Sequence, residues 1–491
     1  MLRIVSQAIP ANNEPESPTK EQMYQRAIEE AQRALHRAVA ARLGPKASFS
    51  AREGALLASA NDACRLDLQT TLQAMAEAQP ARVQLDEAIY ERHQDGAATY
   101  HSLCGPLEVR RPTYRKTGER NGPTVAPLEL AAGLIDGATP ALAYRVALGY
   151  AQGPGRQAEE QMHADHRRPP SRSTLERLGK AIGTGITQAA PRIESVVREA
   201  ETLPAGARAV SVGIDRTTVP MEEVRPEGTP PATRRRPRTR PYVRQAPARV
   251  DVKYRMAYVG TVSVVDAAGE TLVTRRYAIP AADDPTTLVA RMLADVGRAR
   301  AQNPRLPVGV VQDAAPELWT LIRDRLSADP NVHRWHEAID RYHLNERLGE
   351  MLRITEPDET RRHQQLARWN HALDTDDTAI DRIARWVAEQ VTCHDGDARE
   401  TLEAHWTYLL KNNDRMRYAT GRRLGLPCGS GATEGACKSV VTCRAKGSGQ
   451  RWHDDGITAA LTLRAAYLSE RLPTLWPHFA AAYSADVQAV A

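Results

Sequence analysis

Phenylalanine is nearly absent from this chain of 491 residues, which contains only Phe49 and Phe479. Seven tryptophans and fifteen tyrosines replace part of the missing aromatic volume. Hydrophobic residues still make up 42% of the sequence, which is enough to build globular cores. At roughly 150 residues per domain, the length indicates about three domains.

Long apolar runs are also missing. No stretch approaches the roughly 18 consecutive apolar residues of a membrane-spanning helix, so we expect no membrane partner. The first residues, MLRIVSQAIPANNEPESPTK, lack the apolar core and cleavage site of a signal peptide. We therefore expect a cytoplasmic protein, associated with the nucleoid if it binds DNA.

The cysteines are few and form no CxxC pair, so neither a zinc site nor a disulfide framework is indicated. The net charge of +6 permits binding to nucleic acid without identifying it as the partner. The distribution of the basic residues is therefore more informative than their sum. The six cysteines are Cys64, Cys104, Cys393, Cys428, Cys437 and Cys443.

The first 200 residues have the pattern of a mostly helical region with one extended segment. Apolar residues at helical spacing predict helices over about 20–43 and 53–78. The pattern changes to short extended pieces over about 98–115. It becomes helical again over 127–200, in pieces separated by glycine and proline.

One part of this region has the spacing of a helix-turn-helix. A helix over about 155–165 is followed by the turn HRRPP at 166–170 and by a second helix from about Ser171. A recognition helix presents the residues of its first turns to the major groove of DNA. An ordinary helical hairpin with a basic loop is the alternative. The candidate DNA-reading residues are Arg172, Ser173, Thr174 and Arg177.

Two short apolar runs each end in an aspartate. ARAVSVGID at 207–215 ends in Asp215, and PVGVVQD at 307–313 ends in Asp313. Both runs are typical of buried strands, and the carboxyl ends of neighbouring strands meet at one edge of a sheet. A single aspartate at such a place is often only a turn former. Two in matching context predict a metal site.

Between these runs the sequence predicts an antiparallel strand pair over 254–265 and 271–279, followed by a helix over 285–301. An arginine-rich segment, TRRRPRTRPYVR at 233–244, precedes the pair. It contains six arginines, two prolines and no acid, so no regular packed element is expected. This segment is predicted either to contact DNA phosphates or to be a solvated insertion without a binding role.

The segment 428–456 adds a third acid. A helix is expected over about 433–446, with one apolar side and a second side that carries Glu434, Lys438 and Thr442. A Glu–Lys pair at this spacing is usually a surface pair worth roughly 0.2–0.5 kcal/mol. The two upstream aspartates make Glu434 a candidate metal ligand instead. The basic and aromatic residues beyond it are Arg444, Lys446, Arg451 and Trp452.

A long helical block separates the second aspartate from Glu434. It begins near HEAIDRYHLNERL at 336–348, which contains Asp340 and His343 three positions apart, and it extends to about residue 423. His343 is either functional or a satisfied core histidine. The residues after 457 are expected to be helical and to complete the core. The expected core anchors of the block are Trp335, Trp369, Trp386 and Trp406.

The three acids share one chemistry. Carboxylates are hard oxygen ligands that suit Mg²⁺ or Mn²⁺ and leave coordination positions for water and phosphate. Two such ions, about 3.5–4 Å apart, activate an attacking hydroxyl and stabilise the leaving oxygen. Asp215, Asp313 and Glu434 are therefore the candidate metal platform for phosphoryl transfer.

The same motifs resemble those of bacterial insertion-sequence transposases of the DDE (Asp, Asp, Glu) class. More narrowly, they are similar to the ISKra-type group, which is related to Mutator-like transposases. The motifs cover a small fraction of the chain, and their order spans 207–476. They are VSVGIDRTTVPME at 210–222, VGVVQDAAPELW at 308–319, IDRYHLNERL at 339–348 and, as the most specific, GSGATEGACKSVVTCRAKGSGQRW at 429–452.

The resemblance implies an α/β fold with an RNase H-like catalytic core interrupted by an all-helical insertion domain. A mostly helical DNA-binding region would precede the core. Cysteines that relatives carry after the extended segment near residue 110 are absent here, so no zinc-stabilised module is expected. The expected domains are an N-terminal, mostly helical region at 1–125 and a helical region with the helix-turn-helix at 126–203. The core is expected at 204–330 and 426–491, and the all-helical insertion at 331–425.

The resemblance also implies roles for the site residues. Asp215, Asp313 and Glu434 would be the catalytic metal ligands. Asp340 and His343 match a D-x-x-H motif whose implied work is to position DNA ends. The residues implied in phosphate contact are Lys438, Arg444, Lys446 and Arg451, and Trp452 would stack on an unpaired base.

The implied function is DNA transposition. The protein would bind terminal inverted repeats, cleave the ends hydrolytically and join the freed 3′-OH to target DNA. Coordinated cutting of two ends implies a homodimer or larger assembly on double-stranded DNA. Two alternatives stay open: a catalytically inactive, domesticated DNA-binding regulator, and an RNase H-like nuclease without strand transfer.

Overall fold

The structure is a computed structural model that describes residues 20–224, 250–330, 332–485 and 487–490. These residues form a mixed α/β protein with two sheets, arranged in two compact units. The first unit contains 20–128, 160–170 and 489–490 of the described residues, and the second contains 129–159 and most of 171–488. No helix in the described part of the chain is both long enough and apolar enough to cross a membrane.

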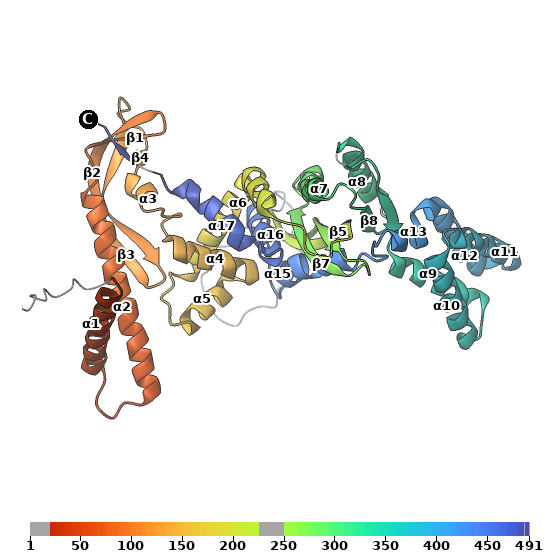
Figure 1. Cartoon of the computed structure of the whole chain (residues 1–491), viewed down its shortest axis with the longest axis horizontal. Helices are drawn as coiled ribbons and strands as arrows, with labels where there is room; N and C mark the ends of the chain where they lie inside the picture. Colours follow the sequence, from red (N-terminus) through yellow and green to blue (C-terminus); the bar gives the residue numbers. More distant parts are fainter. Residues whose placement is uncertain (1–19, 225–249, 331, 486, 491) are drawn as a thin grey trace, which may run out of the picture. The chain divides into compact units, whose positions relative to one another are not determined.

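The first unit combines a helical hairpin with a five-stranded sheet. Helices α1 (Lys20–Arg42) and α2 (Phe49–Glu77) form the hairpin and confirm the two predicted helices (Figure 1). The Gln73 side chain joins α2 to the sheet, because its Oε1 accepts from the Arg110 N–H at 2.9 Å. The sheet has the order β10-β1-β2-β3-β4. Its strands are β1 (Arg82–Leu85), β2 (Ala88–Ser102), β3 (Gly105–Lys116), β4 (Thr124–Val125) and β10 (Gln488–Ala489).

The extended segment is longer than the sequence indicated, since β2 begins at residue 88 rather than near 98. Many residues of β2 are polar and exposed, which removes the apolar alternation that reveals a strand. The end of the chain also differs from its prediction. The residues after 480 form a 3₁₀ turn, η3 (Ala481–Tyr483), and the edge strand β10 instead of a helix.

Four helices follow the first sheet in the chain. They are α3 (Pro127–Ala131), α4 (Pro140–Gln152), α5 (Gly155–Ala164) and α6 (Arg172–Ala200). The two helices predicted around the HRRPP turn are therefore present. Ser171 caps α6, because its hydroxyl accepts the Thr174 N–H at 3.4 Å. With 29 residues, α6 is roughly 43 Å long.

The second unit is built on a sheet of order β7-β6-β5-β8-β9. β5 pairs antiparallel with β6, and β6 pairs antiparallel with β7. On the other side, β8 and β9 continue the sheet in parallel. The strands are β5 (Ala209–Val224), β6 (Val250–Val265), β7 (Thr271–Pro280), β8 (Val308–Gln312) and β9 (His336–Ile339).

Helices cover both faces of this sheet (Figure 1). Val210, Val212 and Ile214 of β5 are buried in the same core as α7 (Pro285–Gln302) and α8 (Pro316–Ala328). Alternate residues of β5 point the other way, and Val219 and Met221 share a second core with the C-terminal helices. Those helices are α14 (Gly431–Ala436), the π-helical turn η2 (Cys437–Thr442), α15 (Cys443–Ala445) and α16 (Asp454–Leu468), followed in the chain by α17 (Leu472–Ala480).

The predicted helical block is present between β9 and α14, although its first residues form strand β9 and are not helical. Trp369 is 8% exposed and meets Trp386 edge to face at 4.9 Å between ring centroids. Trp335 and Trp406 are half-buried against the same core, as predicted. The block contains α9 (Arg341–Thr355), α10 (Glu359–Thr375), α11 (Ala379–Cys393), α12 (Gly396–Asn412), the 3₁₀ turn η1 (Asn413–Arg415) and α13 (Tyr418–Arg423).

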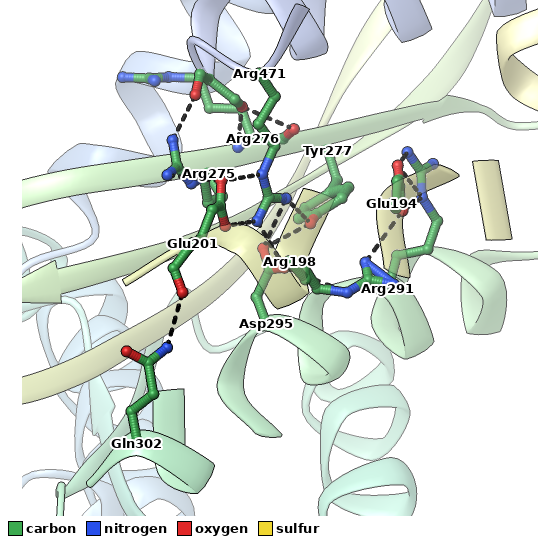
Figure 2. Close-up of polar contacts among 11 residues, drawn as sticks. Glu194, Arg198, Glu201, Arg275, Arg276, Tyr277, Arg291, Asp295, Gln302 and Arg471 are labelled. Atoms are coloured by element: carbon green, nitrogen blue, oxygen red, sulfur yellow. Dashed lines mark hydrogen bonds and ion pairs between the residues drawn. The ribbon is translucent and has the colours of Figure 1, made fainter. Parts of the chain in front are cut away.

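A buried network of charges fixes α6 to this unit. Arg471, just before α17, is 6% exposed and contacts Glu201 at 2.6 Å and Asp295 of α7 at 2.9 Å. Figure 2 shows these side chains converging with Tyr277 of β7, whose hydroxyl donates to Asp295 at 2.6 Å. Within the network Arg291 also meets Glu194 of α6. We call these residues, together with Arg198 and Arg275, the arginine network.

Candidate functional site

The two predicted aspartates lie on neighbouring strands of the second sheet. Asp313 directly follows β8, as predicted. Asp215 was predicted at the end of a strand, and that placement is wrong, because the pairing with β6 continues through Asp215↔Val259 to Val224↔Val250. The parallel pairing of β5 with β8 does end just before Asp215, at Val212↔Val310. Asp215 and Asp313 therefore each lie three positions beyond the last residue pair of the parallel ladder.

Glu434 is placed next to these strands by the packing of α14 on β5. Thr433 is 3% exposed, and its hydroxyl lies 2.7 Å from the Thr261 hydroxyl of β6. Gly213 makes this close approach possible, because a Cβ at that position would lie 2.4 Å from the Thr433 hydroxyl. Glu434 itself is exposed. Helix α14 therefore presents Glu434 from the face of β5 that also carries Asp215.

Asp340 has a different role from the predicted DNA contact, because its side chain is only 1% exposed. It caps α9 by accepting the Tyr342 N–H at 2.5 Å. Its Oδ2 also accepts the Ser430 N–H at 2.5 Å. The Ser430 hydroxyl lies 2.5 Å from Asp340 Oδ2 and 2.8 Å from Glu434 Oε1. Asp340 therefore positions the segment that carries Glu434.

The Ser430 hydroxyl has only one proton to donate. It can satisfy Asp340 or Glu434, but not both carboxylates at once. No Lys or Arg forms an ion pair with Asp215, Asp340 or Glu434 among the described residues. The site therefore carries more negative charge than the surrounding side chains balance.

His343 makes a direct contact with Asp313. Its Nε2 lies 3.0 Å from Asp313 Oδ1, and its Nδ1 lies 3.2 Å from Glu346 Oε2. Burial lowers the pKa of His343, but the hydrogen bond to Glu346 and the charge of Asp313 outweigh it, so the pKa lies above 6.5. His343 is half-exposed at the site rather than a core histidine.

The pKa of Asp313 reports how close the acids are to one another. Burial raises the pKa of this carboxyl most, and His343 opposes the shift. The charges of Asp215, Asp340 and Glu434 raise the pKa of Asp313 further. Four acids from four separate stretches of the sequence therefore share one electrostatic environment.

The donor set suits a hard divalent cation, because carboxylate oxygens bearing unbalanced negative charge are the ligands that Mg²⁺ and Mn²⁺ prefer. The geometry is less complete. In the described part of the chain, no group of three or more His, Cys, Asp or Glu side chains is arranged to hold a metal ion. Each acid instead has a partner within the protein, and side-chain rotation would be needed to converge them on one ion.

The helix that carries Glu434 has an unexpected π-helical turn. The apolar side that the sequence predicted is present, with Ala436, Val440 and Val441 buried. Across the π turn η2, Cys437 Sγ donates to Asp215 Oδ2 at 3.3 Å, and Lys446 Nζ donates to Thr217 Oγ1 at 2.8 Å. π-Helical turns occur frequently at functional sites. Here the turn places a thiol and an ammonium group against the same strand.

The other residues of 429–452 that were predicted to contact DNA differ in their exposure to solvent. Arg444 is 2% exposed, donates to the Tyr150 carbonyl at 2.9 Å and stacks on Trp452 at 4.9 Å, so its predicted phosphate contact is wrong. Trp452 is half-buried in the second core and donates to the Ala445 carbonyl at 3.0 Å, so it is a packing residue rather than an open stacking platform. Lys438 is exposed, and no described ion pair joins it to Glu434.

Arg451 has a side chain 43% exposed and lies 3.4 Å from Glu222, which is seven positions beyond Asp215 on β5 and therefore away from the acids. At the start of α6, Arg172 pairs with Glu159 at 3.2 Å, and Arg177 pairs with Asp136. Both arginines stay more than half exposed. The arginine-rich segment 233–244 lies outside the described residues.

Several side chains that contact the candidate site residues were not predicted from the sequence. Ser430 lies inside the most specific motif, but no spacing rule indicates that its hydroxyl would bridge two acids. Cys437 is buried on the apolar side of its helix, and its contact with Asp215 depends on a strand 222 residues away. Glu346 forms an i,i+3 pair with His343, which the helical spacing could have revealed.

No protein-family model matches this chain, and no curated protein matches it.

Proposed function

We propose that this protein is a DNA transposase of the DDE class. It would bind the terminal inverted repeats of its element, cleave the ends and join them to target DNA by phosphoryl transfer. The observation that carries the proposal is the placement of the three acids. Asp215 lies on β5, Asp313 directly follows the neighbouring strand β8, and α14, which packs on the sheet through the Thr433–Thr261 contact, carries Glu434 beside them. The sequence motifs select the same three acids.

The strand arrangement supports an RNase H-like core. Three antiparallel strands, β7-β6-β5, are extended by the parallel strands β8 and β9, with helices on both faces. Helices α9–α13 lie between β9 and α14 in the chain, as expected for an insertion that separates the second acid from the third. This order of elements is the one that the resemblance implies.

In the proposed mechanism, Asp215, Asp313 and Glu434 would hold a divalent cation. Such a cation supplies Lewis-acid activation of the attacking hydroxyl and charge stabilisation of the leaving oxygen. Ser430 and Asp340 orient Glu434, and Cys437 orients Asp215. His343, whose Nε2 contacts Asp313 Oδ1, would hold a proton there when the imidazole is charged. Lys446, which reaches Thr217 two positions beyond Asp215, adds positive charge where a phosphate would approach.

Two displacements are required. In the first, water attacks the phosphorus at the element end, the P–O3′ bond breaks, and the departing 3′ oxygen takes a proton to become a free hydroxyl. In the second, that 3′-OH attacks a phosphodiester of target DNA, a new P–O3′ bond forms, and the target strand's own 3′ oxygen leaves as a hydroxyl. The same acids serve both steps, because both are in-line displacements at phosphorus.

The test is Mg²⁺-dependent cleavage and joining of DNA that carries the sequences flanking the gene. Asp215→Asn, Asp313→Asn and Glu434→Gln should each lower the cleavage rate by roughly a hundredfold or more, about 3 kcal/mol. Asp324→Asn on α8, which neutralises an exposed acid outside the site, should not change the rate. Inverted repeats bracketing the gene would support the assignment.

A DNA-binding regulator without catalytic activity is the second candidate. It is favoured by one observation, the lack of a ready three-ligand group among the described residues. Wild-type protein that binds DNA but cuts no faster than the three variants would establish this alternative. Cleaved but unjoined products would instead indicate an RNase H-like nuclease.

A further inference from the structure

A groove leads away from the candidate site between the helical block and the end of β8. It encloses about 1080 Å³ and is bounded by α9, α12, η1 and the loop after β8. Asp313 and His343 lie in its wall, so it adjoins the site described above. Figure 1 shows α9 and α12 side by side in the block. Its charged lining consists of Asp313, His343, Glu346, Arg347, Glu350, Arg353, Lys411 and Arg415.

The lining of the groove has four Lys or Arg side chains and three acids. Asp313 and Glu346 both contact His343, which gathers the acids at the end next to the site. Elsewhere the lining has four basic side chains and one acid, Glu350. None of the four basic residues, Arg347, Arg353, Lys411 and Arg415, belongs to an ion pair among the described residues. The groove therefore carries positive charge that the described side chains do not neutralise.

Two of the arginines are held in place without an acidic partner. The Arg347 guanidinium lies 3.9 Å from the centre of the Tyr408 ring. The Arg415 guanidinium lies 5.0 Å from the centre of the Trp319 ring and donates to the Lys411 carbonyl at 3.2 Å. Stacked guanidinium groups with unused N–H donors are suited to bind phosphate oxygens.

We propose that this groove binds the phosphodiester backbone of a DNA strand that continues from the bond held at Asp313. The proposal rests on the proposed function and extends it by assigning the path of the substrate. His343 and Arg353 are ten positions apart on α9, about 15 Å along the helix axis. At 3.4 Å per nucleotide, this length accommodates about four nucleotides of one strand.

The test measures binding rather than catalysis. Full-length protein is titrated with a fluorescent 12-nucleotide single strand, and separately with its duplex, across a salt series containing EDTA. Arg353→Ala/Lys411→Ala removes two exposed cations and should flatten the slope of log K against log[salt] by about 1.4 for the single strand, or about 1.8 for the duplex. Arg347→Gln, a second variant with a similar stem over Tyr408, should flatten it by roughly half as much.

Arg399→Ala is the matched control, because Arg399 is also on α12 but pairs with Glu403 outside the groove. It should leave the slope unchanged. Groove variants that behave like this control would overturn the groove assignment while leaving the cleavage assay of the acids untouched. Wild-type protein that binds neither probe would also overturn it. Acid variants that cleave DNA as fast as the wild type, with the slopes as expected, would remove the proposed function but keep the groove.

Discussion

The second unit contains two clusters of acids. The acids of one cluster are paired with arginines, whereas most acids of the other have no Lys or Arg partner among the described residues. In the arginine network, the Arg471 guanidinium meets the partly exposed Glu201 at 2.6 Å and the buried Asp295 at 2.9 Å. At the candidate site, Asp215 and Glu434 are held by a thiol and a hydroxyl, and neither has a described cationic partner. Paired buried charges hold elements of a fold together, whereas unpaired carboxylates at an accessible site are free to bind a cation. The difference separates the part that holds the fold from the part that we propose binds a ligand.

The largest effect should come from breaking the arginine network. Arg471→Met leaves Glu201 and Asp295 without their main partner and should lower the free energy of unfolding by roughly 3–5 kcal/mol. Chemical denaturation measures the loss. Arg382→Met, which removes an exposed pair with Asp376, should change it by less than about 1 kcal/mol. Similar losses in both variants would contradict the distinction between the clusters.

Added divalent cation should act on the other cluster alone. Mg²⁺ or Mn²⁺ at a hundred times its dissociation constant should stabilise the native protein by about 2.7 kcal/mol, because the cation neutralises the unbalanced acids. Thermal unfolding with and without the cation, at matched ionic strength, measures this. Asp215→Asn should abolish the shift. An equal shift in that variant would show that the cation binds elsewhere.

Removal of one hydroxyl should loosen the site without unfolding the protein. Ser430→Ala deletes the group between Asp340 and Glu434 and should weaken Mg²⁺ binding by about 10–100-fold. The Mg²⁺ concentration dependence of cleavage is the readout. Ser430→Thr retains the hydroxyl and should restore most of the affinity. A Ser430→Ala variant with unchanged Mg²⁺ dependence would remove the positioning role of the Asp340–Ser430 contact.

The smallest effect concerns the proton on His343. Its pKa in the folded protein is raised above 6.5, so the stability that it contributes is fully present below pH 6.5 and is lost as pH rises through the folded-state pKa. NMR titration of the imidazole gives this value directly. Glu346→Gln should bring the pKa down, because the hydrogen bond to Glu346 is a main cause of the rise. A pKa that stays the same would contradict the contact.

Much of the secondary structure follows from the sequence, because apolar spacing and capping residues are local signals. Helices α6 and α7 and strand β8 lie where the pattern places them. The continuation of β5 beyond Asp215 is a pairing effect, since residues 216–224 are held by β6 and have little strand pattern of their own. The extent of a strand depends on its neighbour, which spacing along one segment does not contain.

The acids of the candidate site could be predicted from the sequence, but the burial and contacts of the residues around them could not. Matching strand contexts selected Asp215 and Asp313. The burial of Asp340 and Arg444 could not be read from the sequence, because a charged residue looks the same in a loop and in a core until its partners are known. Ser430 and Tyr150, which hold these two side chains, come from parts of the chain 90 and 294 residues away.

The π turn at 437–442 sets the angle at which the end of this helix faces the sheet. Lys446 lies nine positions after Cys437, and at 100° per residue a regular α-helix would place the two about 900° apart, on opposite sides. One additional residue in the turn reduces the rotation to about 800°, so both side chains face the same side and reach β5. The π conformation of this turn is therefore part of the site. If the same residues formed a regular α-helix, Lys446 would turn away from β5 without any change in the side chains of the site.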